Sequence, residues 1–497
     1  MRIRDINDYY KRQLDNIAEL SENSRYWADK AADVYRRASQ DFTDTDEMLQ
    51  VMFEMNRLNK IFVAKLHNDF AFYMDVAKQP LPEWKNFTSP PVTDELQESL
   101  AKKLYNIEPG KDQHAILTVG EGARQITKSL FEKCLADGVA PYVDFKDGDF
   151  HSFVLNHTTD DGVRAVAADY VSATSPVTKR MVARPGALTP VVTTRTDREQ
   201  LYTRETKPYE DRIRSGKIFY TLTVIPTKRD AELDGIEYDD YVKLFFELCD
   251  QPWEQIGKAQ KSLIQEFNAA SKVHIVNDDG TDIEMSLVDK DGSHFTFCNS
   301  LIAKNVPGSE IFSAPRLDSV NGTVVAKGRF SKDGRKVMEN LTLTFNNGHL
   351  ESWKAEKGQE YLDEIIGIDE GTRWVGELGI GTNPHLKQHV LNGLLVEKIG
   401  GSFHLALGTP YKYTDYMGEP VKVDNGGNSA LHWDLTTMLR GKGGKIYLDD
   451  RLVMDNGEWL DKSKYDVLNR GWEAIPKDQR PEYWKNYYDP KPTPGQP

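Results

Sequence analysis

A chain of 497 residues cannot fold around one hydrophobic core, because such cores stop growing at roughly 250 to 300 residues. Two or three domains are therefore expected. The spacing of apolar residues changes twice along the sequence, once after a proline-rich stretch and once where helical patterns give way to short alternating segments. We place the boundaries at these changes, which predicts domains over 1–91, 92–272 and 273–497.

The first of these segments has the apolar spacing of two helices. Apolar side chains recur every three or four positions over 44–74, behind the capping residues Asp44 and Thr45, and they predict a long amphipathic helix. A weaker repeat over 9–37 predicts a second helix. The two predict a helical hairpin extension whose apolar stripe serves packing or dimerisation, and the prolines of 80–91 predict a linker after it.

The middle segment has the order of patterns of an α/β domain. Strand-like 115–119 is followed by a helical stretch and then by strand-like 141–145, which predicts a βαβ unit. A further strand is expected over 217–225, and helices are expected over 238–249 and 255–270.

The turn after the first of these strands contains Gly120 and Gly122, as a dinucleotide-binding loop does. The third glycine of such a loop is replaced by Gln125. We therefore interpret this segment as a plain strand-to-helix turn and predict no nucleotide cofactor.

From about residue 273 onwards the sequence consists of short alternating segments between Gly, Asn and Asp turns, which is typical of a mostly β domain. The predicted fold class is therefore α/β plus α+β. It combines an N-terminal helical hairpin extension, an α/β domain and a mostly β C-terminal domain that holds the candidate chemistry.

The composition argues against several classes of function. The formal charge of −14 repels nucleic acid and anionic lipid but tolerates metal cations. No stretch approaches the roughly 18 uninterrupted apolar residues of a membrane helix, and the polar start of the sequence has no secretory signal, so we expect a soluble, cytoplasmic protein. Three distant cysteines indicate neither a disulfide framework nor a cysteine zinc site.

Candidate metal ligands occur in the mostly β segment. The stretch 402–408 alternates strictly, so that His404 shares its face with small residues and has room for a ligand. His432 and Asp434 lie two residues apart and share a face in an extended chain. Imidazole nitrogen and carboxylate oxygen are both ligands for divalent ions in the zinc range.

Two carboxylates, Glu310 and Glu377, lie in apolar surroundings of the same segment. A buried carboxylate needs a cation, an amide donor or a proton. Taken singly, each candidate is more often an ordinary core or capping residue. A further pair, His385 and His389, has a zinc-like spacing on a helix, but Leu386 replaces the glutamate of a His-Glu-x-x-His motif, so we interpret that pair as a solvated helix face.

Four ordered blocks of the sequence resemble the signature blocks of the aminopeptidase T and aminopeptidase S family of metallo-aminopeptidases. The resemblance extends over 273–460 and, more loosely, over 96–270, whereas the residues before about 92 look like an extension. The blocks are 305–315 with 321–324, 376–383, 404–411 and 432–434.

The resemblance implies a co-catalytic site for two divalent metal ions. It implies ligands at Glu310, Glu377, His404, His432 and Asp434, with Glu377 as the bridge, and it adds Glu397 as a further ligand or base and Tyr411 as the catalytic tyrosine. Zinc is the first expectation, and cobalt, manganese and magnesium accept the same ligands. Glu310 or Glu397 is expected to shuttle a proton.

The activity implied by the resemblance is release of N-terminal amino acids from short peptides through a metal-activated water. We expect peptide substrates with a free N-terminus, a homodimer, and neither nucleic acid nor membrane as partner. The alternative is a mononuclear iron dioxygenase that opens dihydroxypyridine rings on the same scaffold, which needs His404, His432 and Asp434 but not the glutamates. A non-catalytic protein is the third reading, but the ligand set is intact.

Overall fold

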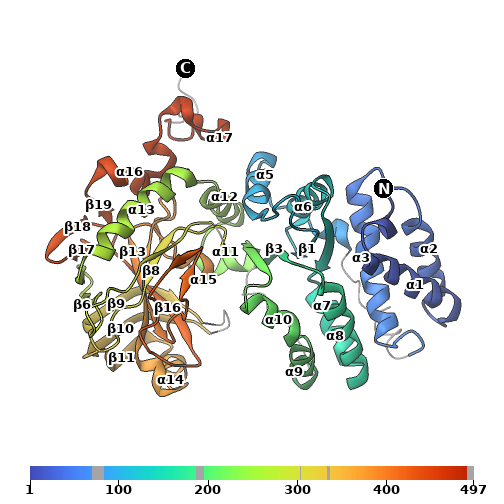
Figure 1. Ribbon diagram of the computed structural model, residues 1–497, viewed down its shortest axis with the longest axis horizontal. Helices are drawn as coiled ribbons and strands as arrows, with labels where there is room; N and C mark the ends of the chain where they lie inside the picture. The colour runs from blue at the N-terminus through green and yellow to red at the C-terminus, as the bar shows by residue number, and fades with distance from the viewer. Residues whose placement is uncertain (70–82, 186–194, 303, 333–335, 490–497) are drawn as a thin grey trace. The chain divides into compact units, whose positions relative to one another are not determined.

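The computed structural model describes residues 1–69, 83–185, 195–302, 304–332 and 336–489. The chain forms two compact units, Met1–Thr227 and Lys228–Pro497. Their boundary lies between Thr227 and Lys228, and the finer division at 91/92 and 272/273 stays a prediction. Both units combine helices with sheets, so the mixed α/β class is confirmed (Figure 1).

Three helices lie at the start of the first unit: α1 (Asp8–Asn23), α2 (Ala28–Ala38) and α3 (Thr45–Val63), drawn in blue in Figure 1. The prediction of one helix over 9–37, and with it a simple hairpin, is wrong. The chain turns between α1 and α2, where the Ser24 hydroxyl accepts hydrogen bonds from the N–H groups of Tyr26 and Trp27. Such a local side-chain bond competes with helix continuation.

The start of α3 agrees with its predicted cap. The Asp44 carboxylate accepts a hydrogen bond of 2.8 Å from the N–H of Asp46. The helix ends at Val63, and the part of the predicted range 44–74 beyond residue 69 lies outside the described residues.

The first unit contains a parallel sheet of order β2-β1-β3-β4. Its strands are β1 (His114–Val119), β2 (Ala140–Phe145), β3 (Lys179–Pro185) and β4 (Phe219–Ile225). The predicted βαβ unit is confirmed as β1-α6-β2, and the turn through Gly120 leads plainly from strand to helix. The helices around the sheet are α5 (Asp94–Leu104), α6 (Arg124–Ala136), α7 (Gly148–His157), α8 (Asp160–Thr174), α9 (Thr196–Glu205) and α10 (Lys207–Arg214), with short helices η1 (Ile3–Asp5) and η2 (Trp84–Asn86) before them.

The N-terminal helices cover the free edge of this sheet. The hydroxyl of Tyr10 accepts a hydrogen bond of 2.9 Å from the N–H of Val143, and the Asn7 amide donates one of 3.2 Å to the carbonyl of Pro141. These bonds use backbone groups of the edge strand β2 that would otherwise be open to pairing with another chain. The apolar stripe of α1 and α3 is buried within its own unit, and the homodimer stays a prediction.

The second unit begins with three helices, α11 (Lys228–Asp234), α12 (Tyr238–Cys249) and α13 (Trp253–Ala269). Two antiparallel sheets follow. The larger has the strand order β11-β10-β9-β6-β5-β17-β18-β19, and the smaller has the order β16-β13-β12-β8-β7. The expected helices over 238–249 and 255–270 are present as α12 and α13, but they belong to this unit rather than to the parallel sheet.

The bounds of the remaining elements follow. The larger sheet contains β5 (Lys272–Val276), β6 (Asp282–Ser286), β9 (Asn321–Phe330), β10 (Met338–Asn346), β11 (His349–Lys357), β17 (Lys445–Leu448), β18 (Arg451–Asp455) and β19 (Glu458–Trp459). The smaller contains β7 (Cys298–Ser300), β8 (Glu310–Ser313), β12 (Val375–Gly381), β13 (Ser402–Gly408) and β16 (His432–Met438). Outside them lie α14 (Gln359–Ile366), η3 (Glu370–Arg373), α15 (Gly393–Val396), β14 (Asp415–Tyr416), β15 (Glu419–Pro420), α16 (Lys462–Arg470), η4 (Gly471–Ala474), η5 (Lys477–Gln479) and α17 (Glu482–Lys485).

The two antiparallel sheets share one hydrophobic core. Ile275 and Leu341 of the larger sheet and Leu378 and Leu405 of the smaller belong to the same buried cluster. Because side chains alternate along a strand, one face of the smaller sheet is buried in this core and the candidate ligands lie on its other face. Among the helices described, none combines the length and apolar character needed to cross a membrane.

Candidate metal centre

The register of the smaller sheet brings the candidate ligands of four strands onto one face. Glu310 of β8 lies opposite Gly381, and His404 of β13 lies opposite Gly379. Ala406 lies between Glu377 of β12 and Asp434 of β16, as the partner of both. The small residues on this face leave space above the sheet for the longer side chains. Sequence alternation predicted the faces of His404 and of the pair His432 and Asp434, and the pairing of the strands assembles the cluster.

Gly379 is required by the position of His404. A Cβ atom at position 379 would lie 2.0 Å from His404 Nε2, so any other residue would displace the imidazole. With glycine there, the ring lies across β12 and points its Nε2 atom towards the glutamates. The smallest side chain on one strand thus places the histidine of its neighbour.

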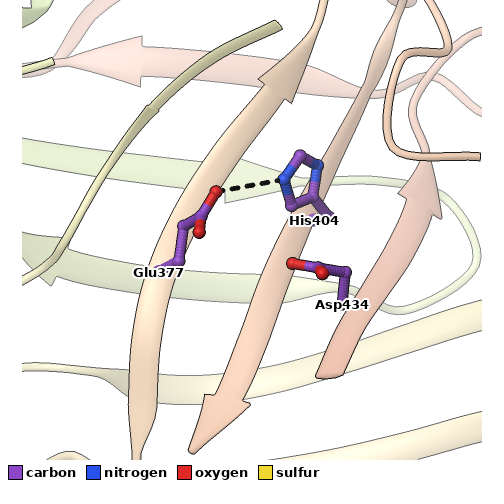
Figure 2. A group of neighbouring side chains, drawn as sticks. All are labelled: Glu377, His404 and Asp434. Atoms are coloured by element: carbon purple, nitrogen blue, oxygen red, sulfur yellow. Dashed lines mark ion pairs between the residues drawn. The ribbon is translucent and has the colours of Figure 1, made fainter. Parts of the chain in front are cut away.

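Glu377, His404 and Asp434 converge from three adjacent strands, as Figure 2 shows. One potential ligand atom from each of the three lies within 4.8 Å of those of the other two. Glu377 Oε1 is 3.5 Å from His404 Nε2, while Glu377 Oε2 is 3.4 Å from His432 Nε2. The two oxygens of one carboxylate therefore face two different histidines.

The other distances complete two neighbouring groups. Glu310 Oε2 lies 3.6 Å from His404 Nε2, and Asp434 Oδ1 lies 3.6 Å from His432 Nε2. Glu310, Glu377 and His404 are nearly fully buried, whereas the His432 side chain is 25% exposed and that of Asp434 is 17% exposed. One group is thus enclosed by protein, and the other is open to solvent.

Without a bound cation, burial and mutual repulsion disfavour the ionised form of these carboxylates. Burial, together with the charges of Glu310 and Glu397, raises the pKa of Glu377 to about 8, although His432 acts in the opposite direction. Burial and the charges of Glu397 and Glu377 also raise the pKa of Asp434 well above its ordinary value. A bound divalent cation would stabilise the ionised carboxylates, because it would supply the missing positive charge.

His432 is oriented by the backbone. Its Nδ1 atom lies 2.8 Å from the carbonyl oxygen of Thr409, which only accepts hydrogen bonds, so Nδ1 carries the proton. The Nε2 atom then has a free lone pair directed towards Glu377 and Asp434. Fixing the tautomer in this way is how proteins prepare a histidine to bind a metal.

Glu397 joins the cluster from outside the sheet, from the C-terminal end of α15. Its Oε2 atom lies 2.9 Å from the Nζ atom of Lys398. Burial opposes its ionisation, but the charges of Lys398 and His404 outweigh burial and lower the pKa of Glu397.

Lys398 is a residue of this centre that sequence reasoning missed. Its Nζ atom lies 2.5 Å from Glu310 Oε1 and 2.9 Å from Glu397 Oε2, and its side chain is 1% exposed. Burial opposes the charge, yet the two carboxylates outweigh burial and raise the pKa of Lys398, so it remains an ammonium. Its only sequence signal is its position next to Glu397, because lysines are rarely buried.

Tyr411 lies on the other side of His432. Its ring centroid is 5.1 Å from that of His432 and 5.3 Å from that of Phe312, and it stacks on Tyr413. The charge of Glu377 raises the pKa of the Tyr411 hydroxyl well above its ordinary value. This hydroxyl is therefore a proton donor at neutral pH.

His385 and His389 do not form the solvated helix face expected from their spacing. The segment between β12 and α15 is not helical, and both side chains are at least partly buried. His385 Nε2 lies 2.9 Å from Glu247 Oε2, and the His389 ring packs edge-on against Phe330 with centroids 4.8 Å apart. Tertiary contacts rather than helical spacing determine where these rings lie.

The donor set fits divalent ions. Glu310 Oε2 and Glu377 Oε2 are buried oxygens without a hydrogen-bond partner among the described residues, and a cation would satisfy both. The four carboxylates and the Lys398 ammonium leave a formal charge of −3, which two dications and one hydroxide would neutralise. The mixture of carboxylate and imidazole is typical of zinc and of the other first-row ions.

The fold and this donor set define a metal-dependent hydrolase, and the comparisons with known proteins specify its family. The family model described as thermophilic metalloprotease (M29) matches residues 97–459, which is most of the chain. The chain therefore belongs to the thermophilic metalloprotease (M29) family, and the resemblance seen in the sequence is confirmed.

Individual relatives agree with this family. Aminopeptidase AmpS of Bacillus subtilis is 26% identical over 282 residues, which cover 50% of this chain and 68% of the relative. Aminopeptidase T of Thermus thermophilus is 28% identical over 193 residues, covering 37% of this chain and 47% of the relative. The solved structure of wild-type AmpT from Thermus thermophilus aligns with a TM-score of 0.56 and 21% identity over 74% of this chain and all of the other, which shows a shared fold.

Proposed function

We propose that this metal-dependent aminopeptidase releases single residues from the N-termini of short peptides, with a water activated between two divalent ions. The observation that carries the two-ion proposal is the orientation of Glu377. Its Oε1 faces His404 at 3.5 Å and its Oε2 faces His432 at 3.4 Å. A carboxylate whose two oxygens point to two separate donor groups is placed to bridge two ions.

The proposed ligands divide into two groups around this bridge. Glu310 and His404 would hold the buried ion, and His432 and Asp434 would hold the more exposed one. Glu397 would act as a further ligand or as a base, because its carboxylate lies 2.9 Å from Lys398 Nζ and lines the same pocket as Asp434. We propose zinc as the first metal to test, with cobalt, manganese and magnesium as alternatives that the same ligands accept.

When bound, the ions lower the pKa of a water and polarise the scissile carbonyl. The protonated hydroxyl of Tyr411 donates a hydrogen bond to the oxyanion that develops on that carbonyl, a contribution of roughly 3 kcal/mol for comparable donors. Glu310 or Glu397 holds the proton released by the water until the leaving amine takes it. Lys398 keeps Glu310 and Glu397 in place and stays charged throughout.

The dioxygenase alternative uses fewer of these residues. One iron held by His404, His432 and Asp434 would not use Glu310 or Glu377 as ligands, although both are buried carboxylates. Burying a carboxylate in that way is costly. The presence of both glutamates against the histidines supports the peptidase, and no contact of the described residues favours the dioxygenase.

Assembly and location are part of the same proposal. We propose a cytoplasmic homodimer. Cys134, Cys249 and Cys298 are buried and form no disulfide, which a reducing compartment favours. Sedimentation of the purified full-length chain measures its size directly, and a monomer at micromolar concentration contradicts the dimer.

The decisive experiment compares unblocked dipeptides with their N-acetylated forms, together with metal analysis of the purified protein. Cleavage of only the unblocked peptides is expected, because the free amine is part of what the centre binds. Chelation should abolish cleavage, and added zinc, cobalt or manganese should restore it. Equal cleavage of blocked peptides, or full activity after exhaustive chelation, contradicts the proposal.

A further inference from the structure

A pocket of about 240 Å³ adjoins the metal centre on its more exposed side. Glu397, His432 and Asp434 form its inner wall. In a peptide substrate the first Cα atom carries the amine, the scissile carbonyl and the side chain. When amine and carbonyl lie at the centre, the first side chain therefore starts beside these three residues and can enter this pocket.

The wall away from the metal centre combines apolar and basic groups. Phe330 and Val390 provide apolar surface for the stem of a side chain. Arg329 and Lys332 are exposed at its edge and bring positive charge. Among the described lining residues the only carboxylates are the two candidate ligands, whose charge bound ions would neutralise.

His389 is a lining residue of this pocket and has an unsatisfied polar atom. Its Nε2 is buried and has no hydrogen-bond partner among the described residues. Burial lowers the pKa of His389 to about 4, so the ring is neutral at pH 7. The ring is held between Phe330 and Gly328, where a Cβ atom would lie 3.0 Å from it. A buried nitrogen without a partner is costly, and a ligand that bonds to it recovers that cost.

We propose that this pocket binds the side chain of the N-terminal residue and favours side chains that end in an amide or carboxylate over those that end in a cation. Glutamine and glutamate have an apolar stem for Phe330 and Val390 and a polar end for His389. Lysine would bring a positive charge towards Arg329 and Lys332. This selectivity rests on the proposed function, because the pocket is a substrate site only if the adjacent centre binds peptides.

The test is calorimetry of the metal-loaded full-length protein with free glutamine, leucine and lysine, which bind without being cleaved. Glutamine should bind about tenfold more tightly than lysine, the size of effect that one hydrogen bond supplies, and leucine should lie between them. His389→Phe keeps a ring against Phe330 and should reduce glutamine to the affinity of leucine. Lys332→Gln should strengthen lysine binding severalfold.

Two matched variants in the same unit serve as controls. His274→Phe on β5 and Lys327→Gln on β9 change the same residue types outside the pocket and should leave all three affinities as they are. Melting temperatures identify a variant that does not fold. If His389→Phe is one of these, Lys332→Gln decides alone, because its exposed position makes folding insensitive to the change.

The outcomes separate the two proposals. Equal affinities for the three amino acids, undetectable binding of all of them, or pocket variants that behave like the controls overturn the inference. Binding in the expected order without cleavage of any dipeptide supports the pocket and contradicts the proposed function. Cleavage of dipeptides without any order among the amino acids contradicts the pocket alone.

Discussion

Replacing Lys398 by methionine removes a buried cation from the candidate metal centre and keeps a side chain of similar length. The Nζ atom of Lys398 lies 2.5 Å from Glu310 and 2.9 Å from Glu397, and the side chain is 1% exposed. Removing one partner of a buried ion pair costs about 3 to 5 kcal/mol, because the remaining charge is left without compensation. Here two carboxylates lose the same partner.

The size of the loss depends on the metal. In the chelated protein the carboxylates have no other cation, so the full 3 to 5 kcal/mol is expected, or about 6 to 10 °C in melting temperature at about 2 °C per kcal/mol for a unit of this size. In the metal-loaded protein the ions compensate Glu310 and Glu397, and the loss should shrink to less than half. Ligands that bind only the folded state raise its stability by mass action, and a more negative site gains more from cations.

Scanning calorimetry of wild type and Lys398→Met, each chelated and metal-loaded, measures these four stabilities. Lys387→Met is the matched control, since Lys387 lies eleven positions earlier and is exposed. It should change the melting temperature by no more than about 1 °C in either state, as surface substitutions do. The reasoning is refuted if Lys398→Met loses the same stability with and without metal, or if the chelated variant melts like wild type.

Three further predictions concern other residues. Glu377→Ala should retain at most one of two bound ions per chain and lose orders of magnitude in peptidase activity without global unfolding, which elemental analysis and circular dichroism check; two ions retained in the variant contradict the bridge. Tyr411→Phe should lower kcat about 100-fold with metal content and KM close to wild type, and an unchanged kcat excludes its hydroxyl from the reaction. The pKa of His389 is about 4 in the folded protein and about 6.5 in the unfolded chain, so the stability it contributes is full above pH 6.5 and is lost as the pH falls towards 4. Measured by urea unfolding over this pH range, the free energy of unfolding of the wild type should fall by at most about 3 kcal/mol more than that of His389→Phe. The same dependence on pH in both proteins contradicts this prediction.

The parts of the fold that the sequence predicted depend on local signals. The cap at Asp44 and the β1-α6-β2 order each depend on a few neighbouring residues, and both are present in the structure. The break at Ser24 was missed because a single serine inside an apolar repeat gives a weak signal against the apolar positions on either side of it. The affiliation of α12 and α13 was also missed, since helical periodicity does not say which sheet a helix covers.

The candidate site shows the same division between local and non-local information. Strand alternation predicted that His404 shares a face with small residues, and the spacing of His432 and Asp434 predicted that these two share a face. The register of the strands agrees with both. No local pattern predicts that Lys398 is buried between Glu310 and Glu397, because the three come together only through tertiary folding. The interpretation of His385 and His389 failed for the same reason, since His385 pairs with Glu247, 138 residues away.

The candidate centre is buried on one side and exposed on the other, and this difference accounts for the position of Lys398. Glu310 and His404 lie on the enclosed side, where neither substrate nor solvent can compensate charge, and Lys398 supplies a permanent positive charge there. On the open side, Asp434 faces the pocket, where a substrate amine and an exchangeable ion can approach. A fixed cation on that side would repel both. Lys398 therefore occupies the enclosed side of the proposed centre and leaves the open side to a metal ion and the substrate.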